Sequence, residues 1–128
     1  MIEGGNDSSQ TVLDAAFKVH SALGPGLLEG AYEACMAFEL RSRGLHVETQ
    51  IPIALHYGGL QIDLAAYRAD LLVEHALLVE LKSVPKLLAI HEAQLLSYIR
   101  MGNFRSGLLI NFSALRLKDG IRRKVNNY

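Results

Sequence analysis

The stretch from Arg68 to Lys82, RADLLVEHALLVELK, constrains the fold more than any other part of this sequence. Two apolar runs flank the short polar break Glu74-His75-Ala76, a pattern that predicts two neighbouring strands joined by a tight connection. A strand buried in a sheet needs no charged side chain, yet each of these runs carries a carboxylate. The fold must therefore account for both acids.

Asp70 and Glu80 are predicted to face each other across this hairpin. Side chains alternate between the two faces of a strand. If the hairpin is centred on His75, Asp70 lies opposite Glu80, and Leu72 lies opposite Leu78. Directly opposed residues have Cβ atoms about 4.5–5.5 Å apart. The two carboxylates are thus expected at the far end of the hairpin, close enough to interact.

Lys82, two residues beyond Glu80 on the same face, leaves two interpretations open. Like charges this close repel, and one carboxyl should resist ionisation unless a cation joins the pair. Lys82 could be that cation, in a purely structural ion pair. Alternatively, a divalent metal could bind, because Mg²⁺ prefers hard oxygen ligands and commonly takes only one or two carboxylates. The lysine could then orient the attacking water and offset phosphate charge.

The rest of the chain predicts an α/β fold in a single domain. In chain order, the sequence predicts helices over residues 11–23 and 27–43, strands over 47–57, 60–74 and 77–82, a helix over 86–101, and a strand over 106–112. The second of these strands is expected to bend near Ala65-Ala66, and Gly58-Gly59 signals a hairpin turn. A meander of three strands would cross over, through a helix, to a fourth strand parallel to the third. Residues 1–9 are expected to be a flexible lead-in, and residues 10–128 the domain.

Composition fits a soluble globular protein. Half of the 128 residues are hydrophobic and a fifth are charged, which argues against disorder. The 13 basic and 13 acidic residues balance, so no global basic field indicates nucleic acid. A local basic cluster near the C-terminus is either a solvated tail or a nucleic-acid contact. It consists of Arg116, Lys118, Arg122, Arg123 and Lys124.

The N-terminus lacks the hydrophobic region of a signal peptide, and no apolar run is long enough to span a bilayer. We therefore expect a cytoplasmic protein with no membrane partner. The single cysteine, Cys35, excludes an internal disulfide and is expected to be a small core residue.

Polar residues along two predicted helices could border the acidic pair. His91, Gln94 and Tyr98 share one flank of the helix over residues 86–101. This flank is either solvated or a border of the site, with Gln94 donating to phosphate or water. In the earlier helix, Glu29 lies near the N-terminus, where a negative charge is favourable by about 0.3–1 kcal/mol, and Tyr32 and Glu33 follow it.

Glu92 belongs to the same predicted helix, over residues 86–101, and is expected on the side that faces the core. An unpaired carboxylate would be costly there. We therefore expect it either to pair with Lys82 or Arg68, or to approach the acidic pair itself.

Taken together, these segments resemble the GxxExxY family. The signature after which the family is named is matched by GLLEGAY, from Gly26 to Tyr32, and RADLLVE, VELK, HEAQLLSY and GLLINF continue its pattern in the same order. This family is placed in the PD-(D/E)XK nuclease-like superfamily. The resemblance implies a restriction-endonuclease-like αβββαβ core, in which helices flank a mixed four-stranded sheet, plus an extra N-terminal helix.

The resemblance also implies roles for individual residues. Asp70 matches the metal-binding aspartate, Glu80 matches the metal-binding acid of the (D/E)XK pair, and Lys82 matches the lysine that assists the water. Glu29 matches an acid that many members contribute to the metal from the first core helix. The QxxxY element is matched by Gln94 and Tyr98.

One position departs from the superfamily pattern, and one residue in the matching region is expected to have a structural role only. Ala69 stands where the name of the superfamily has proline, and this removes little chemistry. His20 falls within the matching region, and we expect it to pack or cap.

The expected function is therefore phosphodiester hydrolysis in nucleic acid, with DNA favoured over RNA and with Mg²⁺ or Mn²⁺ as cofactor. The alternative is a binding or assembly module that keeps the fold without turnover, as a homodimer or as a subunit of a larger complex. Cleavage of a nucleotide or another small phosphoester is a third possibility.

Overall fold

The computed structural model describes residues 8–126, which form three α-helices, seven strands and one short 3₁₀ helix. The bounds of these elements are α1 Ser9–Leu23, α2 Glu29–Ser42, β1 Val47–Pro52, β2 Leu55–Tyr57, β3 Leu60–Ile62, β4 Arg68–Val73, β5 Leu77–Lys82, α3 Ala89–Gly102, β6 Ser106–Asn111, η2 Leu117–Gly120 and β7 Ile121–Val125.

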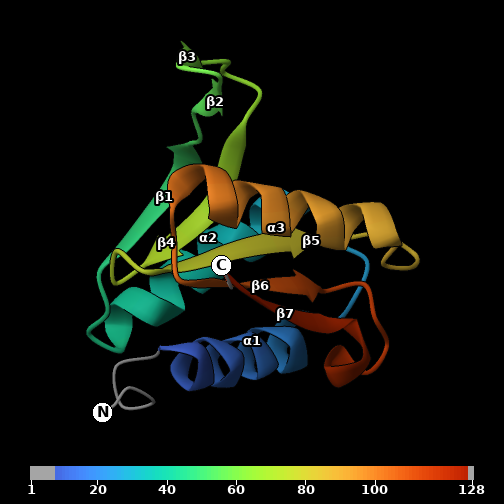
Figure 1. Cartoon of the computed structure of the whole chain (residues 1–128). Helices are drawn as coiled ribbons and strands as arrows, with labels where there is room; N and C mark the ends of the chain where they lie inside the picture. Colours follow the sequence, from blue (N-terminus) through green and yellow to red (C-terminus); the bar gives the residue numbers. More distant parts are fainter. Residues whose placement is uncertain (1–7, 127–128) are drawn as a thin grey trace.

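A five-stranded mixed sheet lies between two layers of helices (Figure 1). Its strand order is β1-β4-β5-β6-β7, in which only the β5–β6 pair is parallel. Side chains from α1 and α2 form a first core with one face of the sheet, and side chains from α3 form a second core with the other face. Burial of both faces explains the nearly unbroken apolar runs of β5 and β6.

This architecture confirms the predicted fold class, including the extra N-terminal helix and the parallel crossover through α3. The hairpin register is also confirmed, since Leu72 pairs with Leu78. Glu74 and His75 form the turn in left-handed conformations, with φ values of 53° and 59°.

The sheet has one strand more than predicted. The basic C-terminal segment, which we interpreted as a tail or a nucleic-acid contact, forms η2 and the edge strand β7. Its three central residues, Arg122 to Lys124, are all basic, and charged side chains are common on edge strands because they discourage pairing with other chains. Because of its positive charges, we had not predicted a strand in this segment.

The two long strands predicted over residues 47–57 and 60–74 are each divided in two, into β1 and β2 and into β3 and β4. β2 and β3 form a separate hairpin that projects from the body of the molecule (Figure 1). Its turn is Gly58-Gly59, as predicted, and both glycines have positive φ values, 55° and 83°. The expected bend near Ala65-Ala66 lies in the break between β3 and β4.

Most of the predicted N-terminal lead-in, residues 1–7, lies outside the described residues, and α1 already begins at Ser9. None of the described helices is both long enough and apolar enough to cross a membrane.

Candidate active site

The carboxylates of Asp70 and Glu80 each accept a hydrogen bond from a backbone amide of the opposite strand at the end of the β4–β5 ladder. Regular pairing reaches Leu71 and Val79, and the acids occupy the next row. The Asp70 amide donates to Oε1 of Glu80 at 2.8 Å, and the Leu81 amide donates to Oδ2 of Asp70 at 2.7 Å. Each side chain therefore binds the backbone of the opposite strand, which fixes the two carboxylates next to each other.

Burial perturbs both acids. Burial raises the pKa of Glu80 to about 7, and the charge of Asp70 adds to this rise. Burial is also the main cause that raises the pKa of Asp70, opposed by the hydrogen bond from the Leu81 amide. The sequence predicted that one carboxyl of the pair would resist ionisation, and Glu80 is that carboxyl.

Lys82 lies near the pair without binding to it. Its positive charge lowers the pKa of both Asp70 and Glu80, although less than burial raises them. Within residues 8–126, Lys82 makes no ion pair within 4.0 Å. The purely structural ion pair is therefore not formed, and the ammonium group remains available to a ligand.

Two acids of α2 reach the same region. Glu29 and Glu33 are one helical turn apart, and their charges help to raise the pKa of Asp70 after burial, Glu33 more than Glu29. Gln50 of β1 links the helix to the sheet. Its Nε2 donates to Oε1 of Glu33 at 2.6 Å and lies 3.3 Å from Oδ1 of Asp70. The sequence reasoning missed Gln50 altogether.

Gln50 has a strained backbone, with φ at 52°. A non-glycine residue in this region costs about 1–3 kcal/mol and persists only where its surroundings hold it. Arg68 provides part of that support, because its Nη1 donates to the Gln50 carbonyl at 2.9 Å. The sequence left Arg68 as an uncertain site residue. In the structure, the Arg68 side chain binds the backbone of Gln50.

A family model matches most of the chain. The family model of the PD-(D/E)XK nuclease superfamily matches residues 6–124, nearly the whole chain. The chain belongs to this superfamily. No curated protein and no solved structure matches the chain. Members of the superfamily are typically nucleases that generally use divalent metals, so membership suggests nuclease activity and binding of nucleic acid.

Of the three polar residues predicted to share a flank of α3, only Tyr98 is buried. Tyr98 is buried in the second core, where burial raises its pKa and the charge of Glu80 adds to the effect. Gln94, one turn earlier, is exposed. His91 caps the helix, because its Nδ1 accepts the Leu88 amide at 2.9 Å. The flank predicted for these three residues thus divides into a buried tyrosine, an exposed amide and a cap.

Glu92 does not have the partners we expected. Instead of Lys82 or Arg68, it binds Lys124 at 2.9 Å and Arg122 at 3.5 Å, both on β7. Hydrogen bonding to Lys124 is the main cause that holds the pKa of Glu92 below its usual range. Two of the basic residues predicted to contact nucleic acid are therefore partly neutralised by this carboxylate.

The other basic residues of the C-terminal cluster lie at the surface. Arg116 is 4.0 Å from Asp119, Arg123 hydrogen-bonds to Oγ of Ser9, and Lys118 is exposed. The cluster is therefore part of the folded edge of the superfamily domain.

Tyr32 and His20 support the loop that precedes the α2 acids. The Tyr32 hydroxyl donates to the Gly24 carbonyl at 2.6 Å and accepts the Leu27 amide at 3.0 Å. Nε2 of His20 donates to the Ala114 carbonyl at 2.9 Å. The Tyr32 contacts hold the Gly-Pro-Gly loop to the start of α2, and the His20 contact ties α1 to the segment after β6.

The side chains at Asp70 and Glu80 suit a hard divalent ion. Both groups offer carboxylate oxygens, and within the described part of the chain no hydrogen bond reaches Oε2 of Glu80. A cation would also offset the burial, and the repulsion from Asp70, that raise the pKa of Glu80 to about 7. Mg²⁺ needs only one or two carboxylates, with water and phosphate completing its shell. The donors present therefore fit the metal that the superfamily generally uses.

Proposed function

We propose that the protein is a divalent-metal-dependent nuclease of the GxxExxY type, hydrolysing phosphodiester bonds in nucleic acid, with DNA as the expected substrate. The observation that carries this proposal is that the Asp70 and Glu80 carboxylates each accept an amide of the opposite strand, which holds them beside Lys82, a residue with no ion pair among residues 8–126. We take residues 10–128 to be one catalytic domain.

In this proposal Asp70 and Glu80 hold Mg²⁺ or Mn²⁺, and Glu29 and Glu33 complete the acidic surface around it. The bound ion would lower the pKa of a water molecule and offset negative charge on the phosphate. Lys82 donates hydrogen bonds to the incoming water or to a phosphate oxygen. The Tyr98 hydroxyl borders the same pocket from α3, and the exposed Gln94 contacts the substrate beside it.

Gln50 acts as a positioning residue in this proposal. Its amide lies between Glu33 and Asp70, so it holds an α2 acid and a β4 acid at a fixed separation. Two carboxylates would otherwise repel each other across the gap between helix and sheet. The strained backbone supports this role, because strain of this kind clusters at functional sites.

A basic surface beyond β5 could receive the nucleic-acid backbone. A pocket after the Lys82 strand end is lined by Lys86, Arg116 and Arg122, together with Asn111, Asp119 and apolar residues. Contacts to phosphate of this kind position a substrate without reading its sequence.

The test is cleavage of a panel of single- and double-stranded DNA and RNA with Mn²⁺, repeated after chelation by EDTA. We expect cleavage that requires the metal and is lost in Asp70→Ala and Lys82→Ala. Lys18→Ala serves as the matched control, because Lys18 is an exposed residue of α1. Normal cleavage by both site variants would refute the assignment. Binding of nucleic acid without cleavage at any metal concentration would favour the non-catalytic module.

A further inference from the structure

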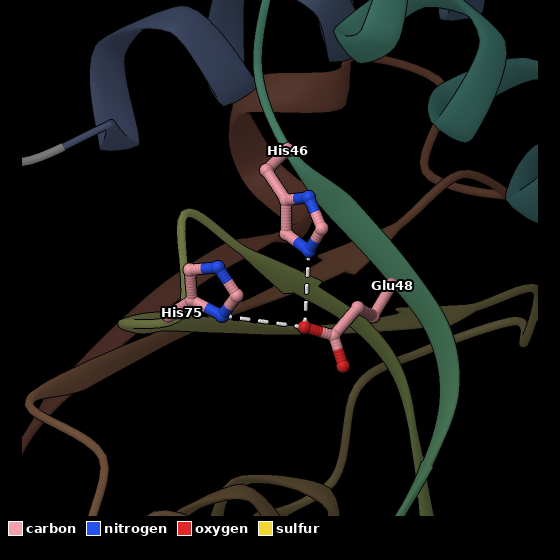
Figure 2. Close-up of side chains that lie close together, drawn as sticks. All are labelled: His46, Glu48 and His75. Carbon is pink, nitrogen blue, oxygen red and sulfur yellow. Dashed lines mark hydrogen bonds and ion pairs between the residues drawn. The ribbon is translucent and has the colours of Figure 1, made fainter.

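A second group of metal-ligand side chains lies away from the acidic pair. His46, Glu48 and His75 place their ligand atoms within 4.8 Å of one another, a compactness that no other three histidine, cysteine or acidic residues reach among residues 8–126. Figure 2 shows both imidazoles directed at the same carboxylate oxygen. Oε2 of Glu48 is 3.1 Å from Nε2 of His46 and 3.3 Å from Nδ1 of His75.

The backbone holds these side chains in place. His46 directly precedes β1 and Glu48 lies near its start, whereas His75 comes from the β4–β5 turn. The His46 amide donates to Oε2 of Glu74 at 2.6 Å, and the Glu74 amide donates to the His46 carbonyl at 2.9 Å. The imidazoles of His46 and His75 stack with their centroids 4.4 Å apart. The turn and the strand are thus tied together at both backbone and side-chain level.

The turn itself carries unfavourable residues. Tight hairpin turns with two left-handed positions favour Asn-Gly or Asp-Gly, but this turn has Glu74 and His75 at φ values of 53° and 59°. Each position contributes a side chain that reaches His46 or Glu48. An observed strain that directs two side chains to one place is a reason to look for a function there.

The separations match the coordination of a borderline transition metal. Zn²⁺ binds imidazole nitrogen and carboxylate oxygen at about 2.0–2.2 Å, so neighbouring ligands of a tetrahedral ion are about 3.3–3.5 Å apart. The two nitrogen–oxygen separations are close to this distance. Two imidazoles and one carboxylate suit Zn²⁺, whereas Mg²⁺ prefers oxygen ligands alone.

We propose that His46, Glu48 and His75 form a binding site for Zn²⁺ or a similar borderline divalent cation, with solvent completing its coordination. The site joins the start of β1 to the β4–β5 turn, at the opposite end of the hairpin from Asp70 and Glu80. It does not depend on the proposed nuclease activity, and neither proposal fails with the other. Its predicted effect is to stabilise the folded chain, since the ion binds ligands that only folding brings together.

The rival interpretation is a surface cluster in which both imidazoles donate hydrogen bonds to Glu48 and no ion binds. The two interpretations differ in a measurable way. A hydrogen-bonded cluster gives no saturable uptake of zinc, whereas a metal site gives one ion per chain and protection against thermal unfolding.

The experiment is calorimetric titration of the full chain with ZnCl₂ after treatment with EDTA and its removal, with Co²⁺ as a spectroscopic substitute. We expect one Zn²⁺ per chain and a visible Co²⁺ absorption that zinc displaces. His46→Gln and His75→Gln should each weaken binding by at least about tenfold, the smallest loss expected when even a supporting partner of a metal ligand is removed. All three ligands are partly exposed, so the variants should fold, and circular dichroism checks that they do.

Three control variants make the outcome decisive. His56→Gln removes an exposed histidine of β2 and Cys35→Ser removes the thiol, and both should bind zinc as the wild type does; Asp70→Asn alters the acidic pair and should keep the zinc that His46→Gln and His75→Gln lose. The proposal is wrong if no saturable binding appears. It is also wrong if His75→Gln binds normally, or if Asp70→Asn loses the zinc that the histidine variants retain.

Discussion

Replacing Glu80 with glutamine should stabilise the metal-free protein at alkaline pH. Burial raises the pKa of Glu80 from 4.5 to about 7, so the folded chain holds a proton on this carboxyl that the unfolded chain has already released. Between these two pH values the folded state binds more protons, and stability therefore falls as pH rises. At pH 8 the wild type bears the full cost of an ionised, buried Glu80. Glutamine at this position bears none of it.

The size of the effect follows from the two pKa values. A rise from 4.5 to about 7, at about 1.4 kcal/mol for each pH unit, gives a difference of about 3 kcal/mol between pH 4.5 and pH 8. The amide of glutamine can still accept the Asp70 amide through its oxygen, so the hydrogen bond across the strands is kept. Asp70 also has a raised pKa, and its contribution remains in the variant.

Urea denaturation in EDTA at pH 5 and pH 8 measures this difference. We expect wild type and Glu80→Gln to agree within about 1 kcal/mol at pH 5, and the variant to be about 2–3 kcal/mol more stable at pH 8. Asp63→Asn, which removes an exposed carboxylate between β3 and β4, should follow the wild type at both pH values.

Adding Mn²⁺ should cancel this difference at pH 8. A ligand at about 100 times its dissociation constant stabilises the folded state by about 2.7 kcal/mol, and only the wild type keeps both carboxylates that would bind it. A wild type with equal stability at pH 5 and pH 8 would refute the reasoning about burial. A manganese effect of equal size in Glu80→Gln would refute the assignment of Glu80 as a metal ligand.

Three further substitutions separate the roles proposed for the site. Lys82→Ala should lower cleavage by roughly 100-fold or more while leaving manganese affinity unchanged, because the lysine is proposed to act on water or phosphate; single-turnover kinetics and calorimetry measure the two effects. Gln50→Gly should increase stability to urea by up to about 1 kcal/mol by relieving the left-handed backbone, but should lower kcat with little change in KM. Glu92→Gln should release Arg122 and Lys124, so nucleic-acid affinity measured by fluorescence anisotropy should rise and its salt dependence should steepen; an unchanged salt slope would contradict the nucleic-acid surface.

The sequence predicted the hairpin register because local rules determine it. Side-chain alternation has a period of two residues, and a short turn leaves few ways to align the strands. Centring the hairpin on His75 was therefore enough to pair Leu72 with Leu78 and to bring Asp70 next to Glu80. A slip of one residue would have put the acids on opposite faces.

The partners of Glu92 could not be predicted because they come from an unpredicted strand. The periodicity of α3 placed Glu92 on the core side, where it would need a cation, but its side chain is 30% exposed beside β7. The candidates were limited to Lys82 and Arg68, since the basic residues after Arg116 were interpreted as a tail or a nucleic-acid contact. Once β7 pairs with β6, its side chains lie beside α3 and supply that cation.

Gln50 was missed for a different reason. Nothing in its sequence neighbourhood marks it, because its function depends on where α2 lies relative to β1. The same uncertainty applies to the acids of that helix. Glu29 and Glu33 are one turn apart, and only the position of the helix along its axis decides which has the stronger effect on Asp70.

In β1 and β4 the side chains switch from one face of the sheet to the other part-way along the strand. This switch explains how one row of residues contacts both layers of helices. Val47 belongs to the first core, yet Ile51, four residues along the same strand, packs against the second. In β4, Leu71 belongs to the first core and Ala69 to the second, although the β1–β4 register is continuous. Both strands therefore exchange faces at the row of Gln50 and Asp70.

A regular strand would direct the side chain of Asp70 to one face only. At the exchange, Asp70 instead interacts with Glu33 on the α1–α2 side and with Glu80 and Tyr98 on the α3 side. The left-handed conformation of Gln50 is where β1 makes this exchange, so its strain and the meeting of acids from two layers have the same structural cause. It follows that relieving the strain at Gln50 should disperse the acids, even in a variant whose fold is more stable.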